Sequence, residues 1–303
     1  MTTYLWKDYH CAYEEMPGGE SPALLLIHPI GVGLSKQFWS PFIEHWIRYS
    51  QTQCASQAPV YSPDLLGCGE SDMPKKAYSP ADWAEQLADF IEKVVKKPVV
   101  LVVQGALLPV AVALMSQFKQ TANQVKGIVL SGPPDWRLMT TPVETWQQSL
   151  SWRLLTSPLG NAFYRYARRE RFLRSFSERQ LFGHANDVSS AWLSMLHEGS
   201  QEMASRYAVF SFLAGFWRQD YAAAIAQIQQ PVLVVMGDDA STIDRKTAQN
   251  LRQVTDNPSQ KRLQDYIDHF PRAQGISIPG RNVLPYESTA EFVEAIAPFI
   301  EAL

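Results

Sequence analysis

Short apolar runs alternate with amphipathic stretches along most of the chain. Helical periodicity occurs at 38–47, 79–95 and 291–303. Runs rich in Val, Leu and Ile are typical of strands buried on both faces of a parallel sheet. Strands alternating with helices predict an α/β protein with a mostly parallel sheet and helices on both faces. The strand-like runs occupy residues 23–27, 60–64, 98–103, 127–130, 231–237 and 275–278.

Two segments carry local signals for where an element starts or turns. Residues 3–14 alternate enough to predict a strand or hairpin, and we expect its turn at Gly18-Gly19. The helix over 79–95 begins with Ser79, a good cap, and has Pro80 in its first turn.

Residues 98–114 form the stretch around which the rest is organised. An unbroken apolar run ends at Gln104-Gly105 and is followed by an Ala-, Leu- and Val-rich segment that suits a buried helix. A strand, a sharp turn and a helix form the context in which some hydrolases hold a nucleophilic serine, normally within G-x-S-x-G. Here Gly105 occupies the serine position, and Val103 and Leu107 replace the flanking glycines.

The alternation of strands and helices stops between residues 137 and 225. This stretch is rich in aromatic and basic residues and has helical periodicity. We therefore expect an α/β core made of residues 1–136 and 226–303, with a helical cap made of residues 137–225.

Polar or flexible residues follow the ends of several predicted strands. Ligands of open α/β sheets bind at the carboxyl ends of the strands, so these loops are expected to converge on one pocket beneath the cap. The residues concerned are His28, Asp64, Gly105, Asp135, Asp239 and Arg281.

Charge and composition exclude several classes of function. The 303 residues are 46% hydrophobic and carry a net charge of −3. A near-neutral chain offers no basic face of the kind that nucleic acids require. No apolar run is long enough to span a bilayer, and the N-terminus does not resemble a signal peptide. We expect a soluble, cytoplasmic protein.

Cysteine and histidine spacing indicates neither disulfides nor metal. Cys11, Cys54 and Cys68 are irregularly spaced, and Cys68 has no adjacent histidine to activate it. The histidines of the predicted cap and last strands lack ligand spacing. We expect no metal and no cofactor.

Five segments, in order, resemble the α/β-hydrolase superfamily. His28-Pro29 resembles the family's oxyanion turn, and residues 64–72 match its D-x-x-G-x-G-x-S loop. The stretch at 98–114 resembles the nucleophile elbow, 231–237 the strand that precedes the acid, and 280–287 the G-H-x-x-x-x-E segment. This resemblance implies a capped α/β-hydrolase fold and, in most members, hydrolysis by a Ser-His-Asp triad.

The chain departs from that family at the residues that matter for chemistry. Gly105 stands at the nucleophile position, and Asn282, or Val283 with a shifted gap, at that of the histidine. The usual acid position is Ala240, with Asp239 one residue earlier. A triad needs a nucleophile and a base within reach of it, so triad hydrolysis is not available.

Parts of the family's binding apparatus remain. The resemblance assigns oxyanion-hole amides to Ile30 and Ala106, which bind either a carbonyl or only water. His28 is the nearest histidine to the pocket, with a structural role as the alternative. Asp135 is either an acid or a cap for the segment that enters the helical insertion. Asp239 is either an acid or a cap for a helix that starts near Thr242. The Gln104 amide either faces the pocket or packs against a neighbouring strand.

Three hypotheses follow. The first is a degenerate α/β-hydrolase that binds a small apolar or carbonyl ligand, or a protein partner, without catalysis. The second is an esterase-like hydrolase or a lyase that uses His28, Asp135 or Asp239, with water in the space left by Gly105. The third is an interaction protein that binds an acidic partner or lipid headgroups through the basic cap helix, for which a solvated surface is the alternative. That helix contains Tyr164, Arg165, Tyr166, Arg168, Arg169, Arg171 and Arg174.

Overall fold

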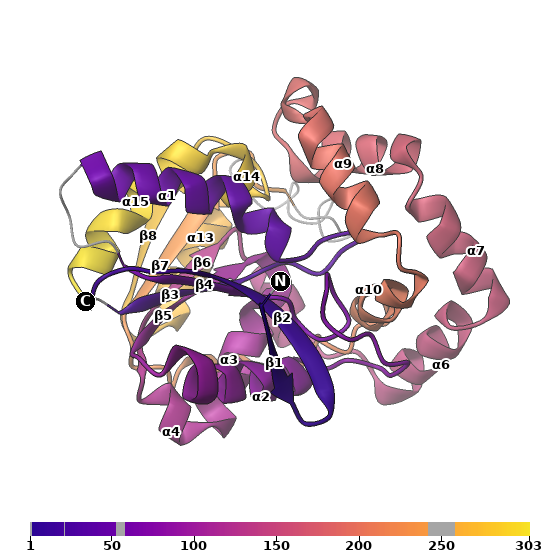
Figure 1. Cartoon of the computed structure of the whole chain (residues 1–303), viewed down its shortest axis with the longest axis horizontal. Coiled ribbons are helices and arrows are strands. Elements are labelled where there is room, and N and C mark those ends of the chain that lie inside the picture. The colour runs from indigo at the N-terminus through magenta and orange to yellow at the C-terminus, as the bar shows by residue number, and fades with distance from the viewer. Residues whose placement is uncertain (1, 21, 53–57, 242–257) are drawn as a thin grey trace.

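The computed structural model describes residues 2–20, 22–52, 58–241 and 258–303, and in them eight strands form one sheet (Figure 1). Only β1–β2 and β2–β4 are antiparallel. The pairs β4–β3, β3–β5, β5–β6, β6–β7 and β7–β8 are parallel. The predicted mostly parallel α/β sheet is therefore confirmed. In spatial order the strands are β1 (Thr2–Trp6), β2 (Tyr9–Met16), β4 (Val60–Pro63), β3 (Ala23–Ile27), β5 (Val99–Gln104), β6 (Val125–Ser131), β7 (Val232–Gly237) and β8 (Ala273–Ile278).

The central strands are apolar because both of their faces are covered. Every residue of β3, β5 and β7 is buried. Alternate residues point to opposite faces, so Leu101 and Val103 belong to one hydrophobic cluster and Val100 and Val102 to the other. Helices on both sides supply the remaining apolar surface, as a parallel sheet requires.

Helices from distant parts of the sequence cover each face. One face packs against α1 (Ser40–Thr52) and α15 (Thr289–Glu301), which lie together above the sheet in Figure 1. The other packs against α2 (Pro80–Phe90) and α3 (Leu108–Gln117). Helix α2 begins with a capping box formed by Ser79 and Asp82.

Between β6 and β7 the described chain forms helices and no strand. Those that Figure 1 labels lie beyond one end of the sheet, on the right of the picture. The helical segment starts with α5 (Trp136–Thr140) and ends with α11 (Ala222–Ile225). Within it are α6 (Thr145–Leu155), α7 (Pro158–Ala167), α8 (Glu170–Phe176), α9 (Ser190–Gly199) and α10 (Arg206–Leu213).

One predicted turn is wrong. Trp6 pairs with Tyr9, so the N-terminal hairpin turns at Lys7-Asp8, where Lys7 has a φ of +53°. Gly18-Gly19 instead lies in the loop that follows β2. A two-residue hairpin needs positive φ, which favours glycine, and here a lysine adopts that conformation. Cys54 and the helix expected near Thr242 lie outside the described residues.

A buried ion pair fixes two loops beside the sheet. Asp64 follows β4, and its carboxylate accepts hydrogen bonds from the Lys36 amide at 2.8 Å and from Lys36 Nζ at 2.9 Å. It also accepts one from the Glu70 amide at 2.9 Å. Burial alone would lower the pKa of Lys36, but the carboxylates of Asp64 and Glu70 raise it above its ordinary value. Asp64, predicted to be at the pocket, thus has a structural role.

We expect Asp64→Ala to lower the free energy of unfolding by about 3–5 kcal/mol, because the buried Lys36 ammonium would keep only the exposed Glu70 carboxylate as a partner. Urea denaturation measures this loss. The matched control is Glu44→Ala, which removes an exposed carboxylate bonded to Arg48 and should cost less than about 1 kcal/mol. Equal losses in the two variants would contradict this role for Asp64.

Candidate functional site

A cavity of about 880 Å³ lies at the carboxyl ends of the strands. Its floor comes from the loops after β3, β5, β6 and β8, and its walls come from α6–α8 and α10. This volume lies within the range of cavities that hold small organic ligands. Of the residues predicted for the pocket, those lining this cavity are Ile30, Gln104, Gly105, Ala106, Asp135 and Asn282.

Gly105 stands at the turn between β5 and the helix that follows. Its φ is +59°, a left-handed conformation that glycine adopts at little cost. A Cβ atom built on Gly105 would meet no atom within 4 Å. The space beside Gly105 is therefore open cavity, with neither a side chain nor a neighbour filling it.

Asn282 is engaged as a structural crosslink. Its Nδ2 donates to the carbonyl oxygens of Gln180 at 2.7 Å and of Ser241 at 3.1 Å. The backbone carbonyl oxygen of Asn282 accepts a hydrogen bond from Gln104 Nε2 at 2.7 Å. The Asn282 side chain thus ties the loop after β8 to the helical segment and to the loop after β7. An amide cannot take a proton from a nucleophile.

His28 lies outside the lining of the cavity, which corrects its prediction as a pocket residue. It is fully buried: Nδ1 is 2.9 Å from the Pro29 carbonyl oxygen, and Nε2 accepts from the Leu65 amide at 3.0 Å. These partners fix the neutral tautomer with the proton on Nδ1. Burial lowers the pKa of His28, although the Asp64 carboxylate opposes this. Both ring nitrogens are occupied, so His28 acts as a link between loops.

Asp239 is also outside the cavity lining. It is exposed, and its backbone N–H donates to the Gly280 carbonyl oxygen at 3.0 Å. The preceding Asp238 accepts a hydrogen bond from Ser277 at 2.6 Å. The acidic turn after β7 therefore joins the loop after β8, because these parallel strands end side by side.

Asp135 is the one candidate acid that lines the cavity among the described residues. Its carboxylate accepts from the Arg137 amide at 2.9 Å and caps α5. Arg262, from α13 (Pro258–His269), is a buried lining residue beside it. Burial lowers the pKa of the Arg262 guanidinium, and the Asp135 charge opposes that effect.

Several lining residues were not foreseen from the sequence. Arg262 lies on a polar helix with no motif, and only its burial marks it. Leu150, Phe163 and Leu213 come from the helical segment, where periodicity gives a helix but not the face that borders a cavity.

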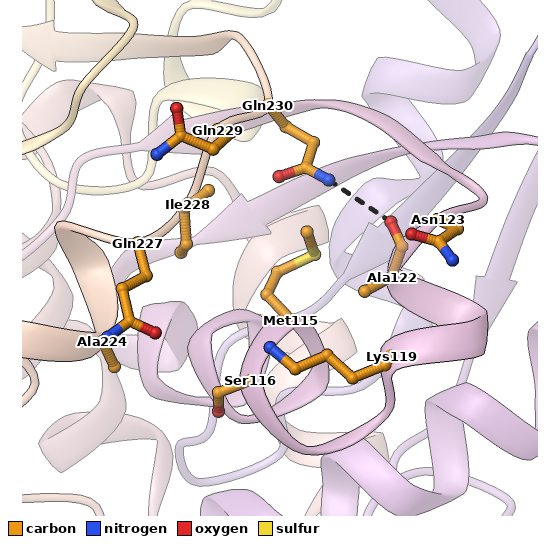
Figure 2. A pocket seen from close by; sticks show the side chains of 10 residues that line it. All are labelled: Met115, Ser116, Lys119, Ala122, Asn123, Ala224, Gln227, Ile228, Gln229 and Gln230. Atoms are coloured by element: carbon orange, nitrogen blue, oxygen red, sulfur yellow. Dashed lines mark hydrogen bonds between the residues drawn. The ribbon is translucent and has the colours of Figure 1, made fainter.

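A second, smaller hollow lies at the amino ends of β6 and β7 (Figure 2). It measures about 170 Å³, and Gln230 Nε2 crosses it to the Ala122 carbonyl oxygen at 3.4 Å. It lies at the opposite end of the strands from the conserved position of ligands in this class of sheet, so the larger cavity is the candidate site.

We expect Gly105→Ala to lower the free energy of unfolding by only about 1–2 kcal/mol, which is the strain of a left-handed alanine, because its Cβ has open space. Thermal or urea unfolding measures this. The matched control is Gly33→Ala, also at positive φ, whose Cβ would overlap the Leu196 carbonyl oxygen. That variant should lose far more stability. A large loss at Gly105 would show that the cavity is closed there.

We expect the unfolding free energy to fall as pH drops from 7 to 5, partly through His28. Its pKa is lower in the folded state than in the unfolded chain, so the unfolded chain takes up the proton first. This effect amounts to at most about 1.4 kcal/mol per pH unit. His28→Gln should reduce the slope measured by urea denaturation, and replacing the exposed His184 should not. An unchanged slope in His28→Gln would contradict the assignment.

Part of the chain is similar in sequence to curated proteins. Uncharacterized proteins of Mycobacterium tuberculosis and Mycobacterium bovis are 31% identical over 107 residues. That match covers 35% of this chain and only 28% of the length of those relatives.

Solved structures are similar over nearly the whole chain. A thermophilic esterase from Thermogutta terrifontis superposes with a TM-score of 0.70 at 18% identity, covering 99% of this chain and 97% of the esterase. An enol-lactonase from Burkholderia xenovorans LB400 gives a TM-score of 0.71 at 12% identity, covering 99% of this chain and 100% of the lactonase. At these identities the similarity shows the fold alone.

The model of the alpha/beta hydrolase family matches residues 24–295, a range that includes the turn at Gly105, Asp135 and the loop of Asn282. The chain belongs to the α/β-hydrolase family.

Proposed function

We propose that this protein binds a small apolar or carbonyl-bearing ligand in the large cavity and does not hydrolyse it. The observation that carries the proposal is Gly105, which leaves the nucleophile position empty while keeping the turn open to the cavity. Leu, Val, Phe and Trp make up half of the lining residues, and the fewer polar ones come from the strand ends and from the surrounding helices, as in binding sites for apolar ligands.

The helical segment α5–α11 acts as a cap in this proposal. Phe212 and Trp217, whose rings stack with centroids 5.0 Å apart, line the cavity from this segment. Asn282 bonds to Gln180 and so holds the segment against the core. In this proposal, asparagine stands where most family members have a catalytic histidine. Asn282 transfers no proton there and instead connects the cap to the core.

A polarised group of the ligand has a place to bind. Ile30 and Ala106 both line the cavity beside Gly105. Ala106 lies in the first turn after β5, and the first N–H groups of a helix lack intrahelical partners. We propose that these two amides bind the carbonyl oxygen of the ligand, as an oxyanion hole does, with no nucleophile to attack its carbon.

Asp135 supports the rival proposal of an enzyme with relocated residues. It is buried in the cavity wall and could orient a water in the space beside Gly105. Against this rival, no histidine lines the cavity in the described part of the chain, and the Asp135 carboxylate already caps α5.

A reducing compartment such as the cytoplasm suits the two described cysteines. Cys11 and Cys68 are free and buried, and burial raises the pKa of the Cys11 thiol to about 12. No described helix has the length and apolar character needed to cross a membrane.

We expect no turnover of short- and medium-chain p-nitrophenyl esters above a mock-purified control, because a nucleophile and a base are both missing. Release of p-nitrophenol is the measurement. Turnover that follows the protein through a second column and disappears in Asp135→Asn would replace the binding proposal with the relocated enzyme.

We expect an environment-sensitive naphthyl ketone fluorophore to bind the wild-type protein and to bind Gly105→Leu at least tenfold more weakly. The added side chain would occupy the open space at the cavity floor. Ser116→Leu, in the smaller hollow of Figure 2, is the matched control and should bind normally. Equal affinity in all three proteins would place the probe elsewhere and contradict the proposed site.

A further inference from the structure

Two neighbouring helices of the cap present apolar stripes to solvent. On α6, Trp146, Leu150 and Leu154 recur every four residues and are 63%, 61% and 58% exposed. On α7, Leu159 and Phe163 follow the same spacing and are also exposed. Residues four apart share one helix face, so each helix turns an apolar face outward. Single exposed apolar residues are ordinary, but a contiguous set marks an interaction surface.

This surface surrounds the opening of the cavity. Trp146, Leu150 and Phe163 are exposed and also line the cavity, as does Leu213 of α10. Side chains that are both lining and exposed lie where a cavity meets solvent. Helices α6 and α7 lie at the edge of the molecule far from the sheet, and α10 lies between them and the sheet (Figure 1). We call the exposed apolar residues of α6, α7 and α10 the rim.

Positive charge accompanies the rim. From residue 145 to residue 176 the chain has six arginines and one glutamate, although the whole chain has a net charge of −3. Arg153 lies on the exposed face of α6, three residues after Leu150, and Arg165 is exposed on α7. Arg169 lies 5.8 Å from the ring centroid of Tyr166, beside the same stripe.

Apolar side chains framed by arginines match the outer part of an anionic bilayer. Leu, Phe and Trp insert at the boundary between headgroups and acyl chains, while Arg binds the phosphates above it. A symmetric dimer fits this surface less well, because the same patch from both copies would bring the arginines against one another.

We propose that the rim docks on an anionic lipid bilayer and that the cavity takes its ligand directly from the lipid phase. The uptake step rests on the proposed ligand-binding function, whereas the docking step does not. In the docked state the rim residues leave water, and an apolar ligand passes from the acyl region into the cavity without crossing the aqueous phase.

Co-sedimentation with sucrose-loaded vesicles tests the docking step. We expect the protein to bind vesicles of phosphatidylcholine with phosphatidylglycerol, and to bind less as salt rises, because salt screens the arginine–phosphate attraction. The double variant Leu154→Ser/Leu159→Ser should bind at least tenfold more weakly. Both residues belong to the rim and lie outside the cavity lining. Arg153→Glu/Arg165→Glu should lose binding to anionic vesicles to a similar extent.

The matched control is Leu5→Ser. Leu5 is 54% exposed on β1, away from the cap, so this variant should bind vesicles normally. Equal loss in Leu5→Ser would mean nonspecific adsorption and would overturn the proposal. A wild-type protein that ignores anionic vesicles would also overturn it. So would a dimer that Leu154→Ser/Leu159→Ser converts to monomer, because the rim would then bind a second copy.

Transfer of the naphthyl ketone fluorophore from preloaded vesicles tests the uptake step. We expect Leu154→Ser/Leu159→Ser to slow transfer while its affinity for the probe in water stays at the wild-type value. If transfer is as fast as in the wild type, uptake from the lipid phase is wrong. If the wild type binds vesicles but not the probe, the proposed ligand-binding function fails and the docking step stands.

Discussion

The turn between β5 and α3 is the constraint on which the site depends. A fully buried strand of the sheet ends there, and the backbone turns directly into a helix, with Gly105 at positive φ. Family members use this strained position to expose a nucleophile. In this chain the same geometry borders an open space, and Ile30, Ala106 and the helical segment between β6 and β7 line the cavity around it. We propose that the fold keeps the pocket without the reacting atom.

Two polar side chains near the strand ends, Asn282 and His28, hold loops of the structure together. Asn282 bonds to Gln180 and Ser241, and His28 bonds to Pro29 and Leu65. Buried polar groups that are fully hydrogen-bonded make a structure rigid, and losing a partner is costly. Both side chains therefore have a structural role, which fits the proposal that the protein binds and releases a ligand unchanged.

The sequence predicts the fold better than the site, for a physical reason. Because β3, β5 and β7 are buried on both faces, their sequences are almost unbroken apolar runs. The sheet and the ends of its strands can therefore be predicted from the hydrophobic pattern alone. Six predicted residues do line the cavity, because they follow strands that end at one edge. His28 and Asp239 do not, since side-chain direction after a strand depends on hydrogen bonds that a sequence does not display. Arg262 and the rim were missed because periodicity identifies a helix without saying what its outer face meets.

The central claim is that the cavity holds its natural ligand without converting it. The most direct test is to extract the compound that co-purifies with the protein, identify it by mass spectrometry, and incubate it with freshly prepared ligand-free protein. We expect native mass spectrometry to show the compound rebound and chromatography to recover it unchanged. Recovery of its acid and alcohol fragments, absent from a mock-purified control, would show that the protein is a hydrolase and would contradict the account.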